Sequence, residues 1–365
     1  MVEGSKIRVL VVDDSMVVRK LVGELLTASP QTSLAGTAAT GEQALTRIEQ
    51  LHPDVVTLDV EMPGMGGLET LRRIRKAYPK LPVIMFSTLT VHGAAATLEA
   101  LSLGATDYAT KPTNTENLAV AKQRMEQELL HKIVGLKLAA PTPISRLANL
   151  TRKAQPQAVR HRVDIVAIGC STGGPNALVD LIPQLPEEMP VPVVIVQHMP
   201  PLFTRLLAER LDDKCKLKVG EGQAQRRLDS GHVWVAPGDY HMTVERKGGD
   251  VLLGLNQDAP ENSCRPAVDA LFRSVAKTFG RHALGVVLTG MGSDGVRGCK
   301  EICDAGGAVM VQDEGSSVVW GMPGAVVAAG LTDDIYPISK IASEIVRRVS
   351  LWRTLSAPAS AAVKV

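Results

Sequence analysis

Residues 7–15 read Ile7-Arg8-Val9-Leu10-Val11-Val12-Asp13-Asp14-Ser15, and this stretch decides the fold expected for the first part of the chain. A β-branched apolar run that ends in two aspartates is typical of a buried strand with functional groups at its carboxyl end. Apolar runs then alternate with stretches of helical spacing, and the expected strands are 7–12, 33–38, 54–58, 82–86 and 106–109. Five strand-then-helix units predict a doubly wound, five-stranded parallel sheet with helices on both faces.

A second α/β pattern begins at residue 163, after a proline-rich basic stretch that is typical of a linker. Its strand candidates are 163–168, 191–196, 233–236, 251–255, 283–288 and 308–311, and residues 232–255 resemble a hairpin pair. We expect a second doubly wound, mostly parallel α/β domain. The predicted organisation is one domain over 5–130, a linker over 131–161, a second domain over 162–350 and a flexible tail over 351–365.

Composition narrows the class of protein. The chain has 365 residues, which suits two domains, and 40 Lys and Arg against 38 Asp and Glu. This near-balance gives no reason to expect a nucleic-acid partner. No stretch reaches the ~18 apolar residues that a membrane span needs, and the N-terminus does not read as a signal peptide. Five cysteines without a C-x-x-C pair indicate reduced thiols in a cytoplasmic protein, and nothing requires more than a monomer.

Polar side chains follow the expected strands of the first domain. Asp13 and Asp14 end the first strand, Asp59 the third and Ser87 the fourth, while Lys111 follows the fifth. Carboxyl ends of parallel strands meet at one edge of a sheet, so these groups should form one site. Clustered carboxylates favour a hard divalent cation, most plausibly Mg²⁺, and the lysine and hydroxyl would hold phosphoryl oxygens. Each of these residues alone would read as a solvated loop residue.

The first domain resembles the receiver domain of bacterial response regulators over about residues 5–130. The matching motifs are Asp13-Asp14-Ser15, Asp59-x-x-Met62-Pro63-Gly64 and Lys111-Pro112. The resemblance implies that Asp59 accepts a phosphoryl group from a partner histidine kinase. It also implies a Mg²⁺ site made by the acidic residues Asp13, Asp14 and Asp59 with the backbone carbonyl of Glu61. Ser87, Tyr108 and Lys111 would be the switch residues.

A second group of polar residues lies at strand ends of the second domain. Gly169-Cys170-Ser171-Thr172-Gly173-Gly174 follows the strand 163–168 and fits G-x-S-x-G, the pattern of a nucleophilic serine on a sharp turn. By itself the pattern is weak, because similar turns occur in many loops. The N–H of Thr172 is placed to stabilise an oxyanion.

A serine nucleophile needs a base and an orienting carboxylate. His198 follows the strand 191–196, and Asp294 lies in the glycine-rich turn after the strand 283–288. Either residue alone is more often structural, but all three ends share one sheet edge. The chain order Ser, His, Asp differs from the Ser, Asp, His order of α/β-hydrolases.

These residues give the second domain a resemblance to chemotaxis protein-glutamate methylesterases over about residues 162–350. The matching stretches are Ser171-Thr172-Gly173-Gly174-Pro175, Gln197-His198-Met199-Pro200, Ala236-Pro237-Gly238-Asp239, Arg265-Pro266-x-Val268-Asp269 and Gly290-Met291-Gly292-x-Asp294-Gly295. The resemblance implies hydrolysis of γ-glutamyl methyl esters on chemoreceptors, often with deamidation of receptor glutamines, and no cofactor in this domain. Thr172 and Met291 are the expected oxyanion or substrate contacts. Cys170 and Tyr240 depart from the alanine and arginine of the family pattern.

Two other functions are alternatives to this one. A DNA-binding response regulator would need a compact helix-turn-helix module with a basic recognition helix. A non-catalytic scaffold could carry the three residues without using them. Loss of ester hydrolysis on replacing Ser171 separates the enzyme from the scaffold.

Overall fold

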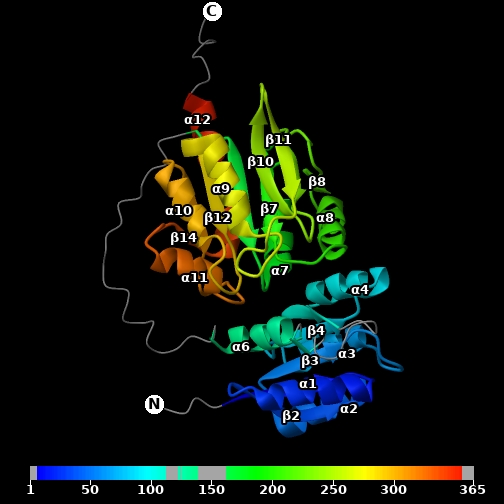
Figure 1. Cartoon of the computed structure of the whole chain (residues 1–365). Helices are drawn as coiled ribbons and strands as arrows, with labels where there is room; N and C mark the ends of the chain where they lie inside the picture. The colour runs from blue at the N-terminus through cyan, green and yellow to red at the C-terminus, as the bar shows by residue number, and fades with distance from the viewer. Residues whose placement is uncertain (1–5, 112–121, 124, 139–161, 356–365) are drawn as a thin grey trace, which may run out of the picture. The chain divides into compact units, whose positions relative to one another are not determined.

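The computed structural model describes residues 6–111, 122–123, 125–138 and 162–355 (Figure 1). The chain divides into two compact units, residues 1–148 and 149–365.

The first unit contains a five-stranded sheet in the order β2-β1-β3-β4-β5. All four strand pairs are parallel, which confirms the predicted doubly wound sheet. The strands are β1 (Ile7–Val12), β2 (Thr32–Ala38), β3 (Val55–Asp59), β4 (Val83–Ser87) and β5 (Asp107–Thr110). The helices are α1 (Met16–Ala28), α2 (Gly41–Leu51), α3 (Gly67–Ala77), α4 (Val91–Ser102), the π-helical turn Glu126–Leu130 and α6 (His131–Leu138).

Short polar residues start the helices of this unit. The side chains of Ser15, Thr40 and Thr90 each accept a hydrogen bond from the backbone N–H three residues later. These N-caps satisfy backbone donors that would otherwise lack partners, so each helix begins directly after a strand. At the other end of the unit, helix α6 occupies the first eight residues of the segment 131–161 predicted as a linker, and its Ile133 is fully buried in the apolar core.

The second unit is built on a seven-stranded sheet in the order β14-β13-β12-β6-β7-β9-β8, with all its pairs parallel. Its strands are β6 (Ile165–Cys170), β7 (Val193–Gln197), β8 (Lys218–Glu221), β9 (His232–Val235), β12 (Ala283–Val287), β13 (Ala308–Gln312) and β14 (Ile335–Tyr336). A separate antiparallel hairpin consists of β10 (His241–Lys247) and β11 (Asp250–Asn256). The mostly parallel α/β prediction is confirmed, and residues 162–355 do not form a helix-turn-helix module.

The hairpin expected over 232–255 was wrong in its pairing. Strand β9 joins the main sheet beside β7, and the antiparallel pair is β10 with β11. Gly248 in the intervening turn has a φ of 60°, and a tight turn with positive φ favours a hairpin at this point. Strands β8 and β14 were not predicted, since each is short and lies at an edge of the sheet.

Helices cover both faces of the second sheet. They are α7 (Gly174–Leu181), α8 (Phe203–Lys214), α9 (Val268–Phe279), α10 (Val296–Asp304), α11 (Gly321–Ala328) and α12 (Ile338–Leu355). Helices α9 and α10 pack against each other, as Figure 1 shows, and α9 also packs against β10. Helix α7 contacts both α8 and α12. One apolar core joins α9, the hairpin and the sheet strands, so the carboxyl ends of β6, β7 and β12 are held together. Helix α12 continues five residues into the segment predicted as a tail.

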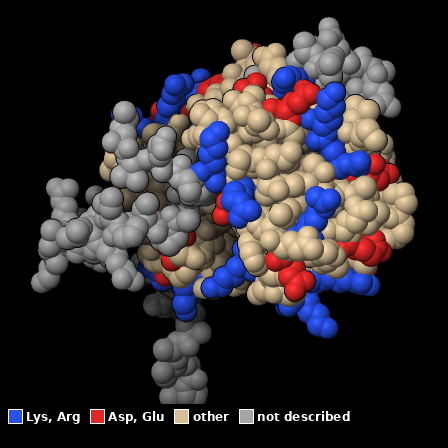
Figure 2. Space-filling view, turned by 90° about the horizontal axis from the view of Figure 1, so that it is seen from below, with Lys and Arg blue, Asp and Glu red and all other residues tan. Residues whose placement is uncertain are grey.

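Figure 2 shows one face of the molecule, on which basic and acidic side chains are interspersed with uncharged ones. The coloured residues form no continuous basic surface there, in keeping with the near-balance of 40 basic and 38 acidic residues. Among the helices of the described residues, none has both the length and the apolar character that a membrane crossing requires.

Candidate active site

The acidic site of the first unit lies where β1 and β3 end. Oxygens of Asp13, Asp14 and Asp59 lie within 4.8 Å of one another. Asp13 and Asp59 are buried and Asp14 is exposed. The ammonium of Lys111 bridges the buried pair, 2.8 Å from Oδ2 of Asp13 and 2.7 Å from Oδ2 of Asp59. The structure therefore brings together the acidic residues and the lysine that the sequence assigned to one site.

The charges in this site influence one another. Burial raises the pKa of Asp59 to about 6, although the hydrogen bond and positive charge of Lys111 oppose that shift. Burial would lower the pKa of Lys111, but its hydrogen bonds to Asp13 and Asp59 leave it raised. The ammonium is therefore charged at neutral pH and is available to neutralise negative charge arriving at Asp59.

The residues present fit a divalent cation. A set of three carboxylates, one of them exposed, offers the oxygen ligands that Mg²⁺ prefers and leaves room for water. The backbone N–H of Glu61 donates to Oδ1 of Asp59 at 3.1 Å, so the chain turns back towards the site at this residue. A ligand role for the Glu61 carbonyl stays a prediction.

The two remaining switch candidates, Ser87 and Tyr108, are both buried. Ser87 ends β4 and its hydroxyl donates to the Thr88 carbonyl at 3.3 Å. Tyr108 in β5 is 2% exposed, and the Lys132 ammonium lies 4.5 Å from the centre of its ring. Burial raises the pKa of Tyr108 well above its ordinary value, so the ring stays neutral.

The candidate nucleophile of the second unit lies on the turn between β6 and α7. Ser171 follows the last residue of β6, and the N–H of Gly174 donates to the Ser171 carbonyl at 2.8 Å. Gly173 has a φ of 78°, a conformation that glycine adopts without strain. A side chain on Gly174 would meet Oε1 of Gln197 at 1.9 Å. The turn is therefore tight because two glycines let the strand run almost directly into the helix.

The candidate base and its carboxylate are in contact. Nε2 of His198 lies 2.8 Å from Oδ2 of Asp294, although 96 residues separate them in the chain. Both side chains are largely buried, with 11% of His198 and 2% of Asp294 exposed. His198 reaches the nucleophile's turn through its backbone N–H, which donates to the Cys170 carbonyl at 3.2 Å. The strand ends that carry the serine, histidine and aspartate do converge on one edge.

Asp294 accepts hydrogen bonds on both of its oxygens. Oδ2 accepts from the backbone N–H of Val268 at 2.6 Å as well as facing His198. Oδ1 accepts from the backbone N–H groups of Asp269 and Gly295 at 3.0 and 2.9 Å, and from the Asn262 amide at 2.9 Å. Burial alone would raise the pKa of Asp294, but the hydrogen bond to His198 and these donors leave it lowered. The carboxylate is therefore ionised and fixed in position.

The second ring nitrogen of His198 faces a cysteine. Sγ of Cys264 lies 3.5 Å from Nδ1, and among the described residues no hydrogen bond joins the Ser171 hydroxyl to the ring. Burial would lower the pKa of His198. The electrostatic interaction with Cys264 and the Asp294 hydrogen bond outweigh this effect and raise the pKa of His198 to about 10. Sequence reasoning missed this contact, because the loop that carries Cys264 has no pattern that points towards the site.

The candidate oxyanion donors have free backbone N–H groups. Within the described residues, the N–H groups of Thr172 and Met291 donate no hydrogen bond. The Thr172 carbonyl accepts from the Thr289 hydroxyl at 2.9 Å, which ties the Ser171 turn to the turn after β12. Gly290, next to Met291, lies against Ser171, since a Cβ there would be 3.0 Å from the serine Cβ.

Comparison with known proteins shows the family to which this chain belongs. Residues 9–123 match the response regulator receiver domain family, and residues 166–345 match the family described as CheB methylesterase. A protein-glutamate methylesterase/protein-glutamine glutaminase of Trichodesmium erythraeum is 50% identical over 351 residues, 94% of this chain and 99% of the relative. One of Nocardioides sp. is 46% identical over 364 residues, 97% of this chain and 99% of the relative. The chain belongs to the protein-glutamate methylesterase/protein-glutamine glutaminase family.

A solved structure also resembles the second unit of this methylesterase. The CheB methylesterase catalytic domain of Thermotoga maritima is 39% identical, with a TM-score of 0.50. The match covers 52% of this chain and 100% of the solved chain. The receiver, the methylesterase domain and the assignment to chemotaxis therefore agree with the family expected from the sequence.

Gln197 is another site residue of the methylesterase whose role the sequence did not indicate. Its amide donates to the carbonyls of Ser171 and His198, at 3.0 and 3.3 Å. The side chain thus spans the two turns that carry the candidate nucleophile and base. The sequence signal that could have indicated this role is the position of Gln197, a polar residue at the end of the otherwise apolar strand β7.

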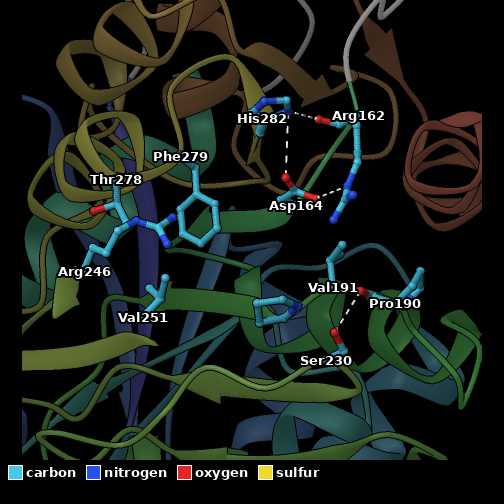
Figure 3. A pocket seen from close by; sticks show the side chains of 11 residues that line it. Arg162, Asp164, Pro190, Val191, Ser230, Arg246, Val251, Thr278, Phe279 and His282 are labelled. Carbon is cyan, nitrogen blue, oxygen red and sulfur yellow. Dashed lines mark hydrogen bonds and ion pairs between the residues drawn. The ribbon is translucent and has the colours of Figure 1, made fainter. Parts of the chain in front are cut away.

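A cavity of about 400 Å³ lies elsewhere in the second unit, at the opposite edge of the sheet (Figure 3). Its lining residues Asp164, Val191 and His282 precede strands instead of following them. The polar groups there pair with one another: Asp164 lies 2.5 Å from Arg162, and Nδ1 of His282 lies 2.7 Å from the Arg162 carbonyl. These contacts indicate a structural role and no part in the methylesterase chemistry.

Proposed function

We propose that Ser171, His198 and Asp294 are the catalytic residues with which this methylesterase hydrolyses γ-glutamyl methyl esters on chemoreceptors. The observation that carries the proposal is the 2.8 Å contact between His198 and Asp294 at the sheet edge that also bears Ser171. The family relatives are named for both methylesterase and glutaminase activity, so we extend the proposal to deamidation of receptor glutamines in the same site.

The chemistry follows from the positions of the two ring nitrogens. Nε2 faces Asp294, so in the deprotonated form of the ring Nδ1 is the nitrogen that accepts the Ser171 proton as the serine oxygen attacks the ester carbonyl. The imidazolium then gives this proton to the methanol that leaves. Water repeats the cycle on the acyl-enzyme and releases glutamate. With an amide substrate the leaving group is ammonia.

Negative charge develops on the carbonyl oxygen during attack. The free N–H groups of Thr172 and Met291 are our candidates for the donors that stabilise it, because Thr172 follows Ser171 and Gly290, next to Met291, lies against Ser171. A preorganised donor of this kind typically contributes ~10²- to 10³-fold to the rate. No metal or organic cofactor enters this part of the proposal.

Methanol release from methylated receptors tests the nucleophile. We expect Ser171→Ala to lower turnover by ~10⁴-fold or more, because a triad acts as a unit. Near-normal release by Ser171→Ala would refute the assignment. If Cys264→Ser abolished release in that case, the thiol beside His198 would be the nucleophile instead.

For the first unit we propose phosphorylation of Asp59 by the histidine kinase of a chemotaxis system. Asp13, Asp14 and Asp59, with the Glu61 carbonyl, would hold Mg²⁺, which supplies positive charge to the incoming phosphoryl group. Lys111 is already 2.7 Å from Asp59 and would hold a phosphoryl oxygen. Ser87 and Tyr108 would change position in response, as switch residues do.

Phosphorylation would raise esterase activity by relieving inhibition from the receiver. A fragment starting at Arg162 should then release methanol faster than the unphosphorylated full chain. A coupling of ~1 to 3 kcal/mol corresponds to a difference of about 5- to 150-fold. A fragment no faster than the full chain would exclude inhibition by the receiver and leave recruitment to receptors as its role.

We further propose that the protein works in the cytoplasm as a monomer. Its supported partners are the kinase and the methylated chemoreceptors, and the charge balance of 40 to 38 favours no nucleic-acid role. Light scattering of the purified full chain tests the oligomeric state, and a mass near twice 38.9 kDa would refute the monomer.

A further inference from the structure

Cys264 lies on the side of His198 that the proposed mechanism needs. Its Sγ is 3.5 Å from Nδ1, and within the described residues no other group bonds to that nitrogen. The ring itself is almost buried, with 11% of the side chain exposed. Thiol, imidazole and carboxylate therefore form a line from Cys264 through His198 to Asp294. A change in the thiol acts directly on the proposed base.

The loop around Cys264 holds the thiol in place. The N–H of Cys264 donates to the Glu261 carbonyl at 2.8 Å, and the Glu261 N–H donates back at 3.1 Å. The next residue, Arg265, is anchored by its guanidinium to Asp239 and to the carbonyls of Gln257 and Asp258. These hydrogen bonds hold the turn in position, and with it the contact between Sγ and Nδ1.

The other four cysteines offer poorer targets for an oxidant. Cys170 and Cys299 are buried, and burial raises the pKa of both thiols. Burial also raises the pKa of Cys215 to about 11 and raises that of Cys303. The thiolate is the reactive form of cysteine, so a raised pKa slows oxidation. Cys264 is partly exposed and has an imidazole within reach to take its proton.

We propose that Cys264 is an oxidative modification site whose sulfenic acid holds His198 and switches ester hydrolysis off. The co-reactant is a hydroperoxide, with hydrogen peroxide as the simplest case. The inference rests on the proposed function in so far as His198 is the base.

The step balances on the groups present. The Cys264 thiol passes its proton to Nδ1 of His198, while Nε2 keeps its contact with Asp294. The thiolate attacks one peroxide oxygen, an S–O bond forms and the O–O bond breaks. The departing hydroxide takes the proton from the imidazolium and leaves as water. Sulfur is oxidised, peroxide is reduced, and the net products are sulfenic acid and one water.

The product oxygen explains the loss of activity. It adds an O–H group to the sulfur beside Nδ1, and an O–H donates a stronger hydrogen bond to the unprotonated ring nitrogen than a thiol S–H does. Nδ1 is then occupied and cannot take the Ser171 proton. A thiol reductant condenses with the sulfenic acid and a second equivalent releases the free cysteine, so the block is reversible.

Peroxide treatment of the full chain tests the proposal, with dimedone labelling and peptide mass mapping as a readout that needs no catalysis. We expect the label on Cys264, and methanol release should fall at least about tenfold, since a general base contributes ~10²-fold or more. A thiol reductant applied without dimedone should restore the rate. The matched control is Cys215→Ser, which should keep the peroxide sensitivity of the wild type. Cys264→Ser, scored against its own untreated rate, should lose that sensitivity.

Several results would overturn the proposal. These are label confined to other cysteines, full activity in protein labelled at Cys264, and peroxide inactivation of Cys264→Ser equal to that of the wild type. If Cys264→Ser were inactive without peroxide, the test would rest on the wild type alone. The fraction of wild-type Cys264 that carries label should then equal the fraction of activity lost, and a mismatch would contradict the proposal. Failure of the proposed function is distinguishable, because untreated wild type would then release no methanol while the labelling still reports on Cys264.

Discussion

Asp294→Asn perturbs the site at the residue with the best-defined surroundings. Only donors point at this carboxylate, and each of its oxygens accepts from at least one backbone N–H. Asparagine has the same shape, but either orientation of its amide sets an NH₂ group against a buried backbone N–H. Two or more buried hydrogen bonds are lost, at about 1 to 3 kcal/mol each. We therefore expect the free energy of unfolding of the second unit to fall by roughly 2 to 6 kcal/mol.

The same change should remove most of the activity. Without a carboxylate at Nε2, His198 loses both its orientation and the charge that stabilises the imidazolium. A loss of ~10⁴-fold in kcat is the expected size for an Asp-to-Asn change in a triad. Methanol release measures this loss. Urea unfolding, followed by the fluorescence of Trp234 and Trp320 in the second unit, measures stability in the same preparation.

Asp334→Asn is the matched control for stability. Its carboxylate lies 2.9 Å from the buried Arg348, so the variant should lose stability while kcat/KM stays at the wild-type value. The reasoning would be refuted if Asp294→Asn kept kcat/KM within about tenfold of the wild type while folded. His198 would then take its orientation from another group.

Three further predictions concern other residues. Asp59→Asn should abolish Mg²⁺-dependent incorporation of labelled phosphate from a small phosphodonor, and label persisting in the variant would contradict the site. Gly174→Ala should destabilise the second unit by about 1 to 3 kcal/mol in urea unfolding, because its Cβ would lie 1.9 Å from Oε1 of Gln197. In Cys264→Ser, the interaction with Cys264 that raises the pKa of His198 is lost, so that pKa should fall. Because the base acts when deprotonated, the acid limb of the pH profile of kcat/KM should move to lower pH, and an unmoved limb would count against the contact.

Much of the fold and of the site was predictable, for a physical reason. Parallel strands bring their carboxyl ends to one edge, so residues directly after strands could be assigned to common sites from the chain alone. Asp13, Asp59 and Lys111 meet as expected, and so do His198 and Asp294. Membership of the family agrees with the motifs on which the resemblance rested.

The parts that were missed depend on contacts between distant segments. Cys264 reaches His198 from a loop 66 residues away, and no periodic pattern marks such a loop. The pairing of β10 with β11 was mistaken for a longer hairpin, because three neighbouring apolar runs offer more than one pairing. Residues 139–161 of the predicted linker lie outside the described residues.

The carboxylate of Asp294 is held largely by main-chain groups, and this has a consequence for how the site tolerates change. The N–H groups of Val268, Asp269 and Gly295 are available whatever side chains those positions carry, so long as the backbone path is kept. The path of the backbone therefore fixes the orientation of the base, His198, through Asp294. An engineer wishing to alter substrate preference could vary neighbouring side chains extensively, whereas inserting or deleting one residue near the start of α9 should disable the enzyme.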